Sequence, residues 1–232
     1  MSIGFRVLQR DRFVDAGTVA RFSSIPVANV SDSMGRMAAG GARLRPMHLS
    51  GRLAGVALTV HTRPGDNLMV HMAINLAQPG DVLVIDAGGD LTNAIMGEMM
   101  LEAARQRGVA GIVVDGSIRD LDAFRTSSVP VFAAGVTHRG PYKNGPGEIN
   151  VPVSIDGMVI EPGDLILGDD DGVVSVPFDD TGIVLEKAEA LSAHEVQFAA
   201  KLRRGEIDRS KWEAMVRELG CEFVEKQSLV RP

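Results

Sequence analysis

The chain has 232 residues, of which 45% are hydrophobic and 23% charged, as expected for one soluble globular domain. Its net charge of −6 and aromatic content of 4% argue against a nucleic-acid surface, which needs clustered basic side chains and stacking rings. No apolar run approaches the roughly 20 residues that span a bilayer, and residues 1–13 lack the apolar core of a signal peptide. We therefore expect a cytoplasmic protein with no membrane contact.

The pattern in the first third of the chain predicts two helices, then a strand, and then another helix. The expected bounds are residues 11–23 for a short helix, 55–62 for the strand, and 67–77 for the helix that follows the turn Pro64-Gly65-Asp66-Asn67. Another helix is expected to begin near Ser31 and Asp32, where Asp32 is its N-cap or, alternatively, points into a site. His71 is interpreted as a packed side chain rather than a metal ligand, because no second histidine follows four residues later.

The next segment has the pattern of strand, glycine-rich loop, helix and strand. The expected bounds are residues 82–86, 87–93, 93–107 and 111–115, in that order. Gly88 and Gly89 mark the loop, and Gly108 stands where a left-handed helix cap is expected. This order implies a parallel crossover, whose loops emerge at the sheet edge where open α/β sheets bind ligands.

Three side chains at that edge suggest a binding site. Arg119 offers a planar fork that suits a carboxylate or phosphate, and the unpaired amides at the start of the helix favour the same anion. Asp120 suits a hard divalent cation, and Glu98 adds a second carboxylate in the first turns of the helix. Together they indicate a site for a small 2-oxo acid. The alternative is that Arg119 and Asp120 form a surface ion pair and that Glu98 only stabilises the helix dipole.

Beyond residue 120 the pattern predicts more strands and a helical C-terminus. The expected elements are a helix over 122–127, a strand over 129–135, a hairpin over 149–160, a strand over 165–167, an amphipathic helix over 179–204 and a last helix over 210–220. The last helix is expected to begin at Ser210, with Glu213 completing a capping box. The loop over 140–147, which contains Tyr142 and Lys143, either covers a site or lies at a subunit contact.

A family resemblance adds to these expectations. Gly97-Glu98, twenty residues, and then Arg119-Asp120 resemble the acidic-x20-Arg-Asp signature of the class II pyruvate aldolases, which are related to the regulator of ribonuclease E activity A. The resemblance extends over residues 7–205 through the blocks PGDNLMVHMAI, PGDVLVID, GVAGIVVDGSIRD, INVPV and EPGDLILGDDDGVVSVP. It implies a compact α/β domain of the swivelling β/β/α type over 1–205. It also implies a helical tail over 206–232 that packs on the body or on a neighbouring subunit.

The resemblance also implies a role for each residue of the signature. Asp120 would hold Mg²⁺ or Mn²⁺, with Glu98 and a neighbouring subunit's Glu195 fixing the water ligands of that ion. Arg119 and the helix amides would clamp the pyruvyl part of the substrate and stabilise its enolate. The residues expected to bind substrate are Gly97, Glu98, Met99, Met100 and Arg119. The implied assembly is a homo-oligomer, either a trimer or a hexamer.

The implied reaction is retro-aldol cleavage of a 4-hydroxy-2-oxo acid, such as 4-hydroxy-4-methyl-2-oxoglutarate or 4-carboxy-4-hydroxy-2-oxoadipate. The lysines fall in loops or on charged helix faces, which favours a metal over a lysine Schiff base as the means of holding the enolate. Glu98 stands where the aldolases are expected to have aspartate, and the stretch before it is poor in bulky residues. Both departures leave the second half of the substrate open, and oxaloacetate decarboxylation fits the same enolate chemistry.

Two other classes of protein are considered beside the lyase. A non-catalytic regulator that binds a ribonuclease or another protein would not need Arg119, Asp120 and Glu195 together. A swivelling phosphotransfer domain would need a phosphorylatable histidine in a Gly/Thr-rich loop, and neither His71 nor His138 has that setting.

Overall fold

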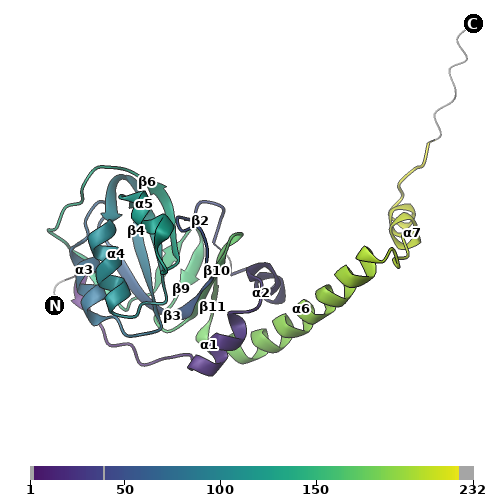
Figure 1. Ribbon diagram of the computed structural model, residues 1–232, viewed down its shortest axis with the longest axis horizontal. Helices are drawn as coiled ribbons and strands as arrows, with labels where there is room; N and C mark the ends of the chain where they lie inside the picture. Colours follow the sequence, from purple (N-terminus) through teal and green to yellow (C-terminus); the bar gives the residue numbers. More distant parts are fainter. Residues whose placement is uncertain (1–2, 39, 225–232) are drawn as a thin grey trace, which may run out of the picture. The chain divides into compact units, whose positions relative to one another are not determined.

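The computed structural model describes residues 3–38 and 40–224, and the chain separates into two compact units, Met1–Ser192 and Ala193–Pro232 (Figure 1). The first unit is a mixed α/β domain built on a nine-stranded sheet, so the predicted fold class is confirmed. Its four central strands are parallel neighbours, in the order β3 (Leu53–Thr62), β4 (Asp81–Met96), β5 (Gly111–Ile118) and β6 (Val131–Val136). β-Branched and other apolar residues dominate these strands because both faces of the sheet are covered.

Antiparallel strands extend this parallel centre on both sides. The remaining strands of the sheet are β1 (Phe5–Val7), β2 (Arg45–Pro46), β7 (Gly147–Ile149), β10 (Leu165–Asp169) and β11 (Gly172–Val176). β2 pairs with β6, while β3 pairs with β10 along its first half and with β7 along its second half. One strand of the centre therefore has two successive neighbours on the same edge.

Three helices cover one face of the sheet, and Figure 1 shows them gathered beside β4. They are α3 (Leu68–Leu76), α4 (Glu98–Gln106) and α5 (Leu121–Thr126). Apolar side chains of these helices, among them Val70, Ala104 and Phe124, pack against alternate residues of the strands such as Ile85 and Ile112. This packing fixes the start of α3 and the start of α4 at the carboxyl ends of the parallel strands.

The opposite face of the sheet is covered by a hairpin. Its strands, β8 (Val153–Ile155) and β9 (Met158–Ile160), pack over the middle strands around Phe132. A second group of elements packs on β10 and β11 from the same side as α3, because Val56 and Leu58 of β3 face the same way. The elements packed on β10 and β11 are α1 (Ala16–Phe22), α2 (Val27–Ser33) and the first turns of α6 (Thr181–Arg203), which follows the short 3₁₀ helix η1 (Phe178–Asp180). The predicted hairpin is confirmed, with its paired strands over residues 153–160.

The prediction for the segment after residue 86 is wrong in one respect. The segment 87–96 remains strand in a bulged form, and the helix begins at Glu98 rather than near Asn93. Eleven residues of β4, from 86 to 96, run beside four of β5, from 115 to 118, through three register shifts. Gly88 and Gly89 adopt positive φ values of 65° and 69° within this excursion. The apolar spacing that predicted a helix over 93–97 therefore belongs to a strand.

Two predicted helix caps are also wrong. α2 ends at Ser33, so Asp32 lies in its last turn, where its carboxylate pairs with Arg36 at 2.6 Å and caps nothing. The N-cap position of α7 (Ser210–Glu218) is Arg209, and Glu213 pairs with Arg217 at 2.8 Å instead of completing a capping box. In both segments the carboxylate that was expected to accept backbone N–H groups at the start of the helix instead forms a salt bridge with an arginine four residues later.

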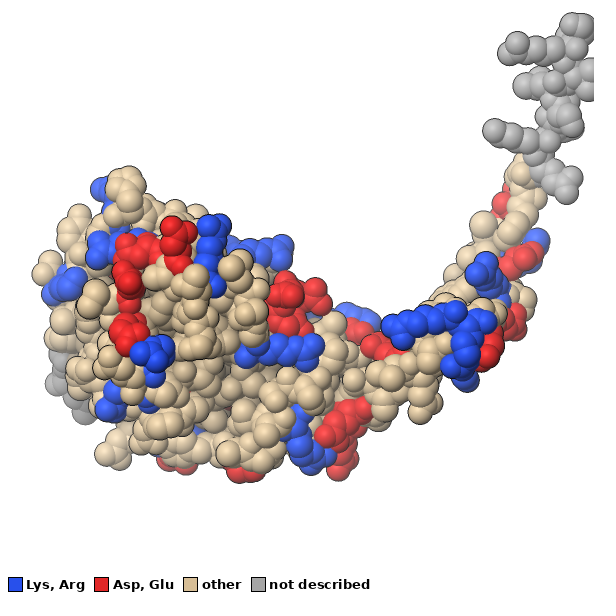
Figure 2. Space-filling view, in the orientation of Figure 1, with Lys and Arg blue, Asp and Glu red and all other residues tan. Residues whose placement is uncertain are grey.

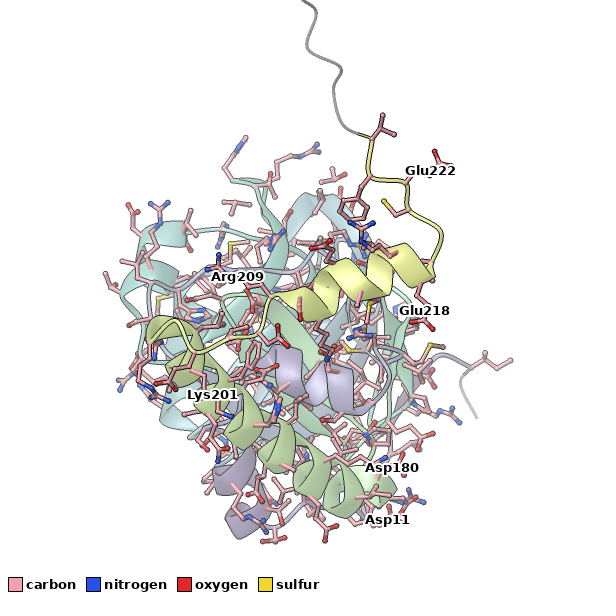
Figure 3. The ribbon with its side chains drawn as sticks, turned by 90° about the vertical axis from the view of Figure 1, so that its right-hand side faces the viewer. Asp11, Asp180, Lys201, Arg209, Glu218 and Glu222 are labelled. Carbon is pink, nitrogen blue, oxygen red and sulfur yellow. The ribbon has the colours of Figure 1, made fainter. Side chains whose placement is uncertain are left out.

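The second unit contains the last part of α6 and the whole of α7. Its helices carry many charged side chains, among them Lys201, Arg209 and Glu218, which Figure 3 labels. The predicted boundary at 205/206 and the predicted packing of the tail stay predictions. Among the residues that the structure describes, no helix is both long and apolar enough to cross a membrane. On the face of the first unit drawn in Figure 2, basic and acidic side chains are interspersed.

Candidate functional site

The turn after β5 joins two of the residues in the signature to the start of α4. Arg119 donates its backbone N–H to the carbonyl of Met96 at 2.9 Å, which ties the turn to the end of β4. Asp120 has a left-handed backbone, with φ of 59° and ψ of 44°, and its Oδ2 accepts the backbone N–H of Glu98 at 3.0 Å. The unusual backbone of Asp120 therefore serves to aim its carboxylate at the first amide of the helix.

Gly97 makes this close approach possible. A Cβ atom at this position would lie 2.5 Å from Oδ2 of Asp120 and 3.0 Å from Nε of Arg119. The structure thus brings Gly97, Arg119 and Asp120 together, as the spacing of the signature suggested. Nε of Arg119 and Oδ2 of Asp120 are 3.6 Å apart, and the two side chains are 46% and 45% exposed. Such a half-exposed pair leaves both groups accessible to a ligand.

A cavity of about 190 Å³ opens beside Arg119. Its wall is formed by the last residues of β4, the first residues of α4, the start of α3 and the loop before β7. The lining residues are Asn67, His71, Ala94, Ile95, Met96, Gly97, Met99, Met100, Arg119, Pro141 and Lys143. Of the five residues expected to bind substrate, four therefore line one cavity at the expected edge of the sheet.

Glu98 lies differently from its three neighbours. Its side chain is exposed and borders a hollow between α4 and α5, together with Glu102, Arg105 and Thr126. Its backbone N–H is taken by Asp120, so this first helix amide is not free for an anion as the sequence suggested. The catalytic role expected for Glu98 stays a prediction, and it requires the carboxylate to reach the cavity from the rim.

His71 and Lys143 line the cavity, although the sequence predicted His71 to be a packed side chain and assigned Lys143 no role in the site. His71 is half-buried on α3, and burial together with the charge of Lys143 lowers the pKa of its imidazole below the usual value. Lys143 comes from the loop over 140–147, which the sequence left open as a cover or a subunit contact. Within this chain the loop contributes to the cavity. The turn before α3 was the available signal, because it places Asn67 and His71 one helical turn apart at the same edge.

Asn67 is the most enclosed polar group of the cavity. It is 2% exposed, and its Nδ2 donates to the carbonyl of Ile95 at 2.9 Å. Its Oδ1 is buried and has no hydrogen-bond partner among the described residues. Since the carbonyl of Ile95 fixes which end of the amide donates, the free atom is an acceptor. A buried acceptor without a partner favours a ligand that can donate a proton or a hydrogen bond.

The acidic residues near the cavity offer few ligands for a divalent cation. Among the described residues no group of three or more His, Cys, Asp and Glu side chains stands close enough to hold a metal ion by itself. Mg²⁺ commonly binds through one or two carboxylates, water and the substrate, and Asp120 offers one such carboxylate beside the cavity. The donor set therefore fits an ion that arrives with its substrate. Glu195 belongs to the second compact unit, and its expected role stays a prediction.

Comparison with known sequences matches this chain to one family and to relatives named as aldolases. The family model described as "RraA-like: Aldolase/RraA" matches residues 27–175. A relative from Halalkalibacterium halodurans, named "Putative 4-hydroxy-4-methyl-2-oxoglutarate aldolase", is 42% identical over 175 residues, which are 75% of this chain and 83% of the relative. A relative of the same name from Ectopseudomonas mendocina is 38% identical over 112 residues, 48% of this chain and 69% of the relative.

Solved structures show the same fold. The RNA-processing inhibitor RraA from Thermus thermophilis is 30% identical, with a TM-score of 0.61 over 66% of this chain and 92% of that one. Streptomyces coelicolor RraAS2, described as an unusual member of the RNase ES inhibitor RraA protein family, is 28% identical. Its TM-score is 0.74, and the match covers 82% of this chain and 98% of that one.

Proposed function

This chain belongs to the Aldolase/RraA family, and from that premise we propose that it is a divalent-metal-dependent lyase that forms the enolate of pyruvate. The reaction is cleavage of a 4-hydroxy-2-oxo acid such as 4-hydroxy-4-methyl-2-oxoglutarate or 4-carboxy-4-hydroxy-2-oxoadipate, decarboxylation of oxaloacetate, or both. One observation carries the proposal, namely that Arg119 and Lys143 line the same small cavity at the start of α4. Two cations in one cavity suit a substrate with a carboxylate at each end.

Arg119 is assigned to the carboxylate and 2-keto oxygens of the substrate. Its guanidinium can hold two oxygens side by side, and the charge that develops on the keto oxygen during cleavage strengthens this interaction. Asp120 is the residue that would hold Mg²⁺ or Mn²⁺. When bound there, the ion would supply Lewis-acid polarisation of the keto group. Gly97 keeps these two side chains close to the cavity because it leaves them the space of a Cβ.

His71 is assigned to the proton of the 4-hydroxyl group. Its lowered pKa keeps the imidazole neutral at neutral pH, so one ring nitrogen can accept a proton. In the retro-aldol step the C3–C4 bond breaks and its electron pair remains on C3 as the enolate. The hydroxyl proton moves to His71 as the second carbonyl product forms. A water held by Glu98 then returns a proton to C3, and pyruvate leaves.

Oxaloacetate requires less of the site. Its C3–C4 bond breaks with loss of carbon dioxide and leaves the same enolate, so Arg119 has the same role and no hydroxyl proton has to be removed. Decarboxylation is therefore expected even where the aldol substrate does not fit.

The first experiment measures pyruvate release from both kinds of substrate. We expect EDTA to abolish the release and Mg²⁺ or Mn²⁺ to restore it. Arg119→Ala should lower kcat/KM by at least about 100-fold, because one donor at a developing oxyanion contributes roughly 3–4 kcal/mol. Arg125→Ala is the matched control, since Arg125 is an exposed arginine on α5 outside the cavity lining. Because Lys143 lines the cavity, activity that persists in EDTA and is trapped by borohydride would overturn the metal mechanism.

The second candidate is a regulator that binds an RNA-processing enzyme or another protein. The observation in its favour is the description of two solved relatives as RraA proteins. A regulator of this kind would not need the side chains that line the cavity. A protein that releases no pyruvate from any of these acids with added Mg²⁺, but binds a ribonuclease, would support the regulator.

A further inference from the structure

The chain contains the tripeptide Pro-Gly-Asp three times, and the three copies form the same turn. They end at Asp66, Asp81 and Asp164. In each, the backbone N–H of the aspartate donates to the carbonyl three residues earlier, at 3.0, 3.1 and 3.2 Å respectively. Each middle glycine has positive φ, and the three aspartates are 0%, 3% and 6% exposed. The copies therefore serve as internal comparisons for one another.

The carboxylate of Asp66 bonds differently from the other two. Oδ2 of Asp81 accepts the backbone N–H of Gln78, and Oδ2 of Asp164 accepts that of Glu161, both at 2.9 Å. Both therefore close their own turn. Oδ2 of Asp66 instead accepts two backbone N–H groups from a distant loop.

The donors to Asp66 come directly after Lys143. They are Asn144, at 2.7 Å, and Gly145, at 3.0 Å, while Oδ1 of Asp66 accepts the backbone N–H of Leu68 at the start of α3. One fully buried carboxylate thus joins the helix that carries His71 to the loop that carries Lys143. The Arg63 guanidinium, 3.7 Å away, is the cationic group recorded beside it.

The same loop is attached at other points before Lys143, and Asp66 holds the two residues that follow it. Arg139 and Gly140 accept hydrogen bonds from Ala94 and Asn93 of β4. Tyr142 exchanges backbone hydrogen bonds with Gly65 and Asn67, at 2.8 and 3.0 Å. A loop rich in glycine and proline has little order of its own, so these contacts determine where Lys143 stands relative to the cavity.

We propose that Asp66 is a positioning residue of the candidate site, which holds the loop so that Lys143 faces the cavity and contributes to substrate affinity. This inference rests on the proposed lyase function for its kinetic consequence. Its structural consequence, order in the loop, does not depend on any activity. Asp66 touches no substrate in this assignment and acts through the backbone beside Lys143.

The test is a double-mutant cycle with Asp66→Asn and Lys143→Met in the full-length protein. Asn keeps the volume of Asp but turns an amide N–H₂ or a single neutral oxygen toward two backbone donors. We expect KM for oxaloacetate to rise about tenfold in each single variant, because one charge-assisted hydrogen bond to the substrate is lost. The value of kcat should change less than about threefold. In the Lys143→Met background, Asp66→Asn should add less than about twofold. Fully additive effects would overturn the proposal.

Asp164→Asn is the matched control, because it changes the same buried turn residue away from the cavity. We expect it to leave KM for oxaloacetate within about twofold of the unsubstituted protein, even though both substitutions lower the melting temperature. An equal rise in KM for Asp164→Asn would mean that only general destabilisation was measured, and it would overturn the proposal. Asp66→Ser, whose short side chain withdraws from the loop, gives the same comparison if Asp66→Asn does not fold.

Hydrogen exchange separates this inference from the proposed function. In the ligand-free protein we expect Asp66→Asn to speed exchange of the amides of residues 144 and 145 at least about tenfold. Oxalate, which mimics the enolate and lacks a distal carboxylate, should bind Asp66→Asn and the unsubstituted protein equally in the presence of Mg²⁺. Unchanged exchange at these amides would overturn the positioning role. Faster exchange in a protein that neither releases pyruvate nor binds oxalate would support that role and reject the lyase.

Discussion

His71 shows how burial and a neighbouring side chain can set the chemistry of a residue. Neither His71 nor Lys143 is unusual in sequence, yet both face a cavity that already contains Arg119. Removing water from the imidazole and placing an ammonium near it both disfavour a second positive charge, so the pKa of His71 falls. A neutral imidazole beside two cations can receive a proton from a substrate that those cations hold.

A pH titration tests this arrangement at the residue scale. We expect the ring protons of His71, followed by NMR, to titrate with a midpoint below 6.5, and Lys143→Met to raise that midpoint. The sign follows because the variant removes the charge repulsion and leaves the burial. The acid limb of kcat/KM should therefore begin at a higher pH in the variant. Lys187→Met, on an exposed part of α6, should leave the midpoint unchanged. A midpoint at or above 6.5 in the unsubstituted protein would contradict the assignment.

At this scale the sequence predicted the position of the signature residues but not which other side chains line the cavity beside them. Arg119 and Asp120 were placed correctly because they follow a buried strand that any α/β pattern would reveal. His71 was interpreted as packed because the only rule applied to it was that of metal ligands. Its lowered pKa depends on burial and on Lys143, which lies 72 residues later in a loop without regular structure. A contact of that kind is created by the fold and leaves no local pattern.

Among the elements, the end of β4 and the start of α4 matter most. Gly97 is the N-cap residue between the bulged strand and the helix, and its φ of −141° is available to any residue. Glycine is needed there for space rather than for backbone freedom. The start of the helix and the turn after β5 therefore pack so closely beside the cavity that position 97 has no room for a methyl group.

Gly97→Ala tests this meeting point. We expect the added Cβ to push Arg119 and Asp120 away from the start of α4 and to lower kcat/KM for pyruvate release about 100-fold, as misplacement by about 1 Å can do. The fold should persist, because the backbone of Gly97 is unstrained. Gly182→Ala on α6 meets no atom within 4 Å and serves as control. If Gly97→Ala keeps full activity, the close approach of these side chains has no role in the reaction.

The elements themselves could be predicted where the pattern was local. The parallel strands, α3, α5 and the hairpin over 153–160 follow from apolar runs and turn residues. The bulged end of β4 could not be predicted, because its register is set by pairing with β5 rather than by its own residues. The same limit applies to the caps of α2 and α7, where a salt bridge competes with the backbone for one carboxylate.

For the whole molecule, the fold follows from the family, but the assembly has to be measured. The first unit contains the cavity with Arg119 and Asp120 beside it, while Glu195 belongs to the second unit, which begins at Ala193. A carboxylate carried on the second unit can serve the site of a neighbouring copy in a closed assembly, either a two-fold dimer or a ring. The predicted role of Glu195 therefore requires an oligomer, and the predicted trimer or hexamer would meet that requirement.

Mixing two inactive variants tests both the oligomeric assembly and the predicted role of Glu195. If Glu195 acts in a neighbouring subunit, Asp120→Ala and Glu195→Ala chains assembled at a one-to-one ratio should recover activity. In a head-to-tail ring each site draws Asp120 from one chain and Glu195 from the next, so about a quarter of the sites contain both.

Asp120→Ala mixed with Arg119→Ala is the control, because these two residues belong to the same chain's half of every site and no mixed site is intact. Two different affinity tags, purified in series, would confirm that the oligomers contain both chains. Mixed oligomers without activity would place Glu195 in its own chain's site, whereas Glu195→Ala chains that are active alone would place it outside the chemistry. Recovery near the expected quarter would mean that the site is completed by assembly, so that dilution to the monomer should abolish pyruvate release even while the first unit stays folded.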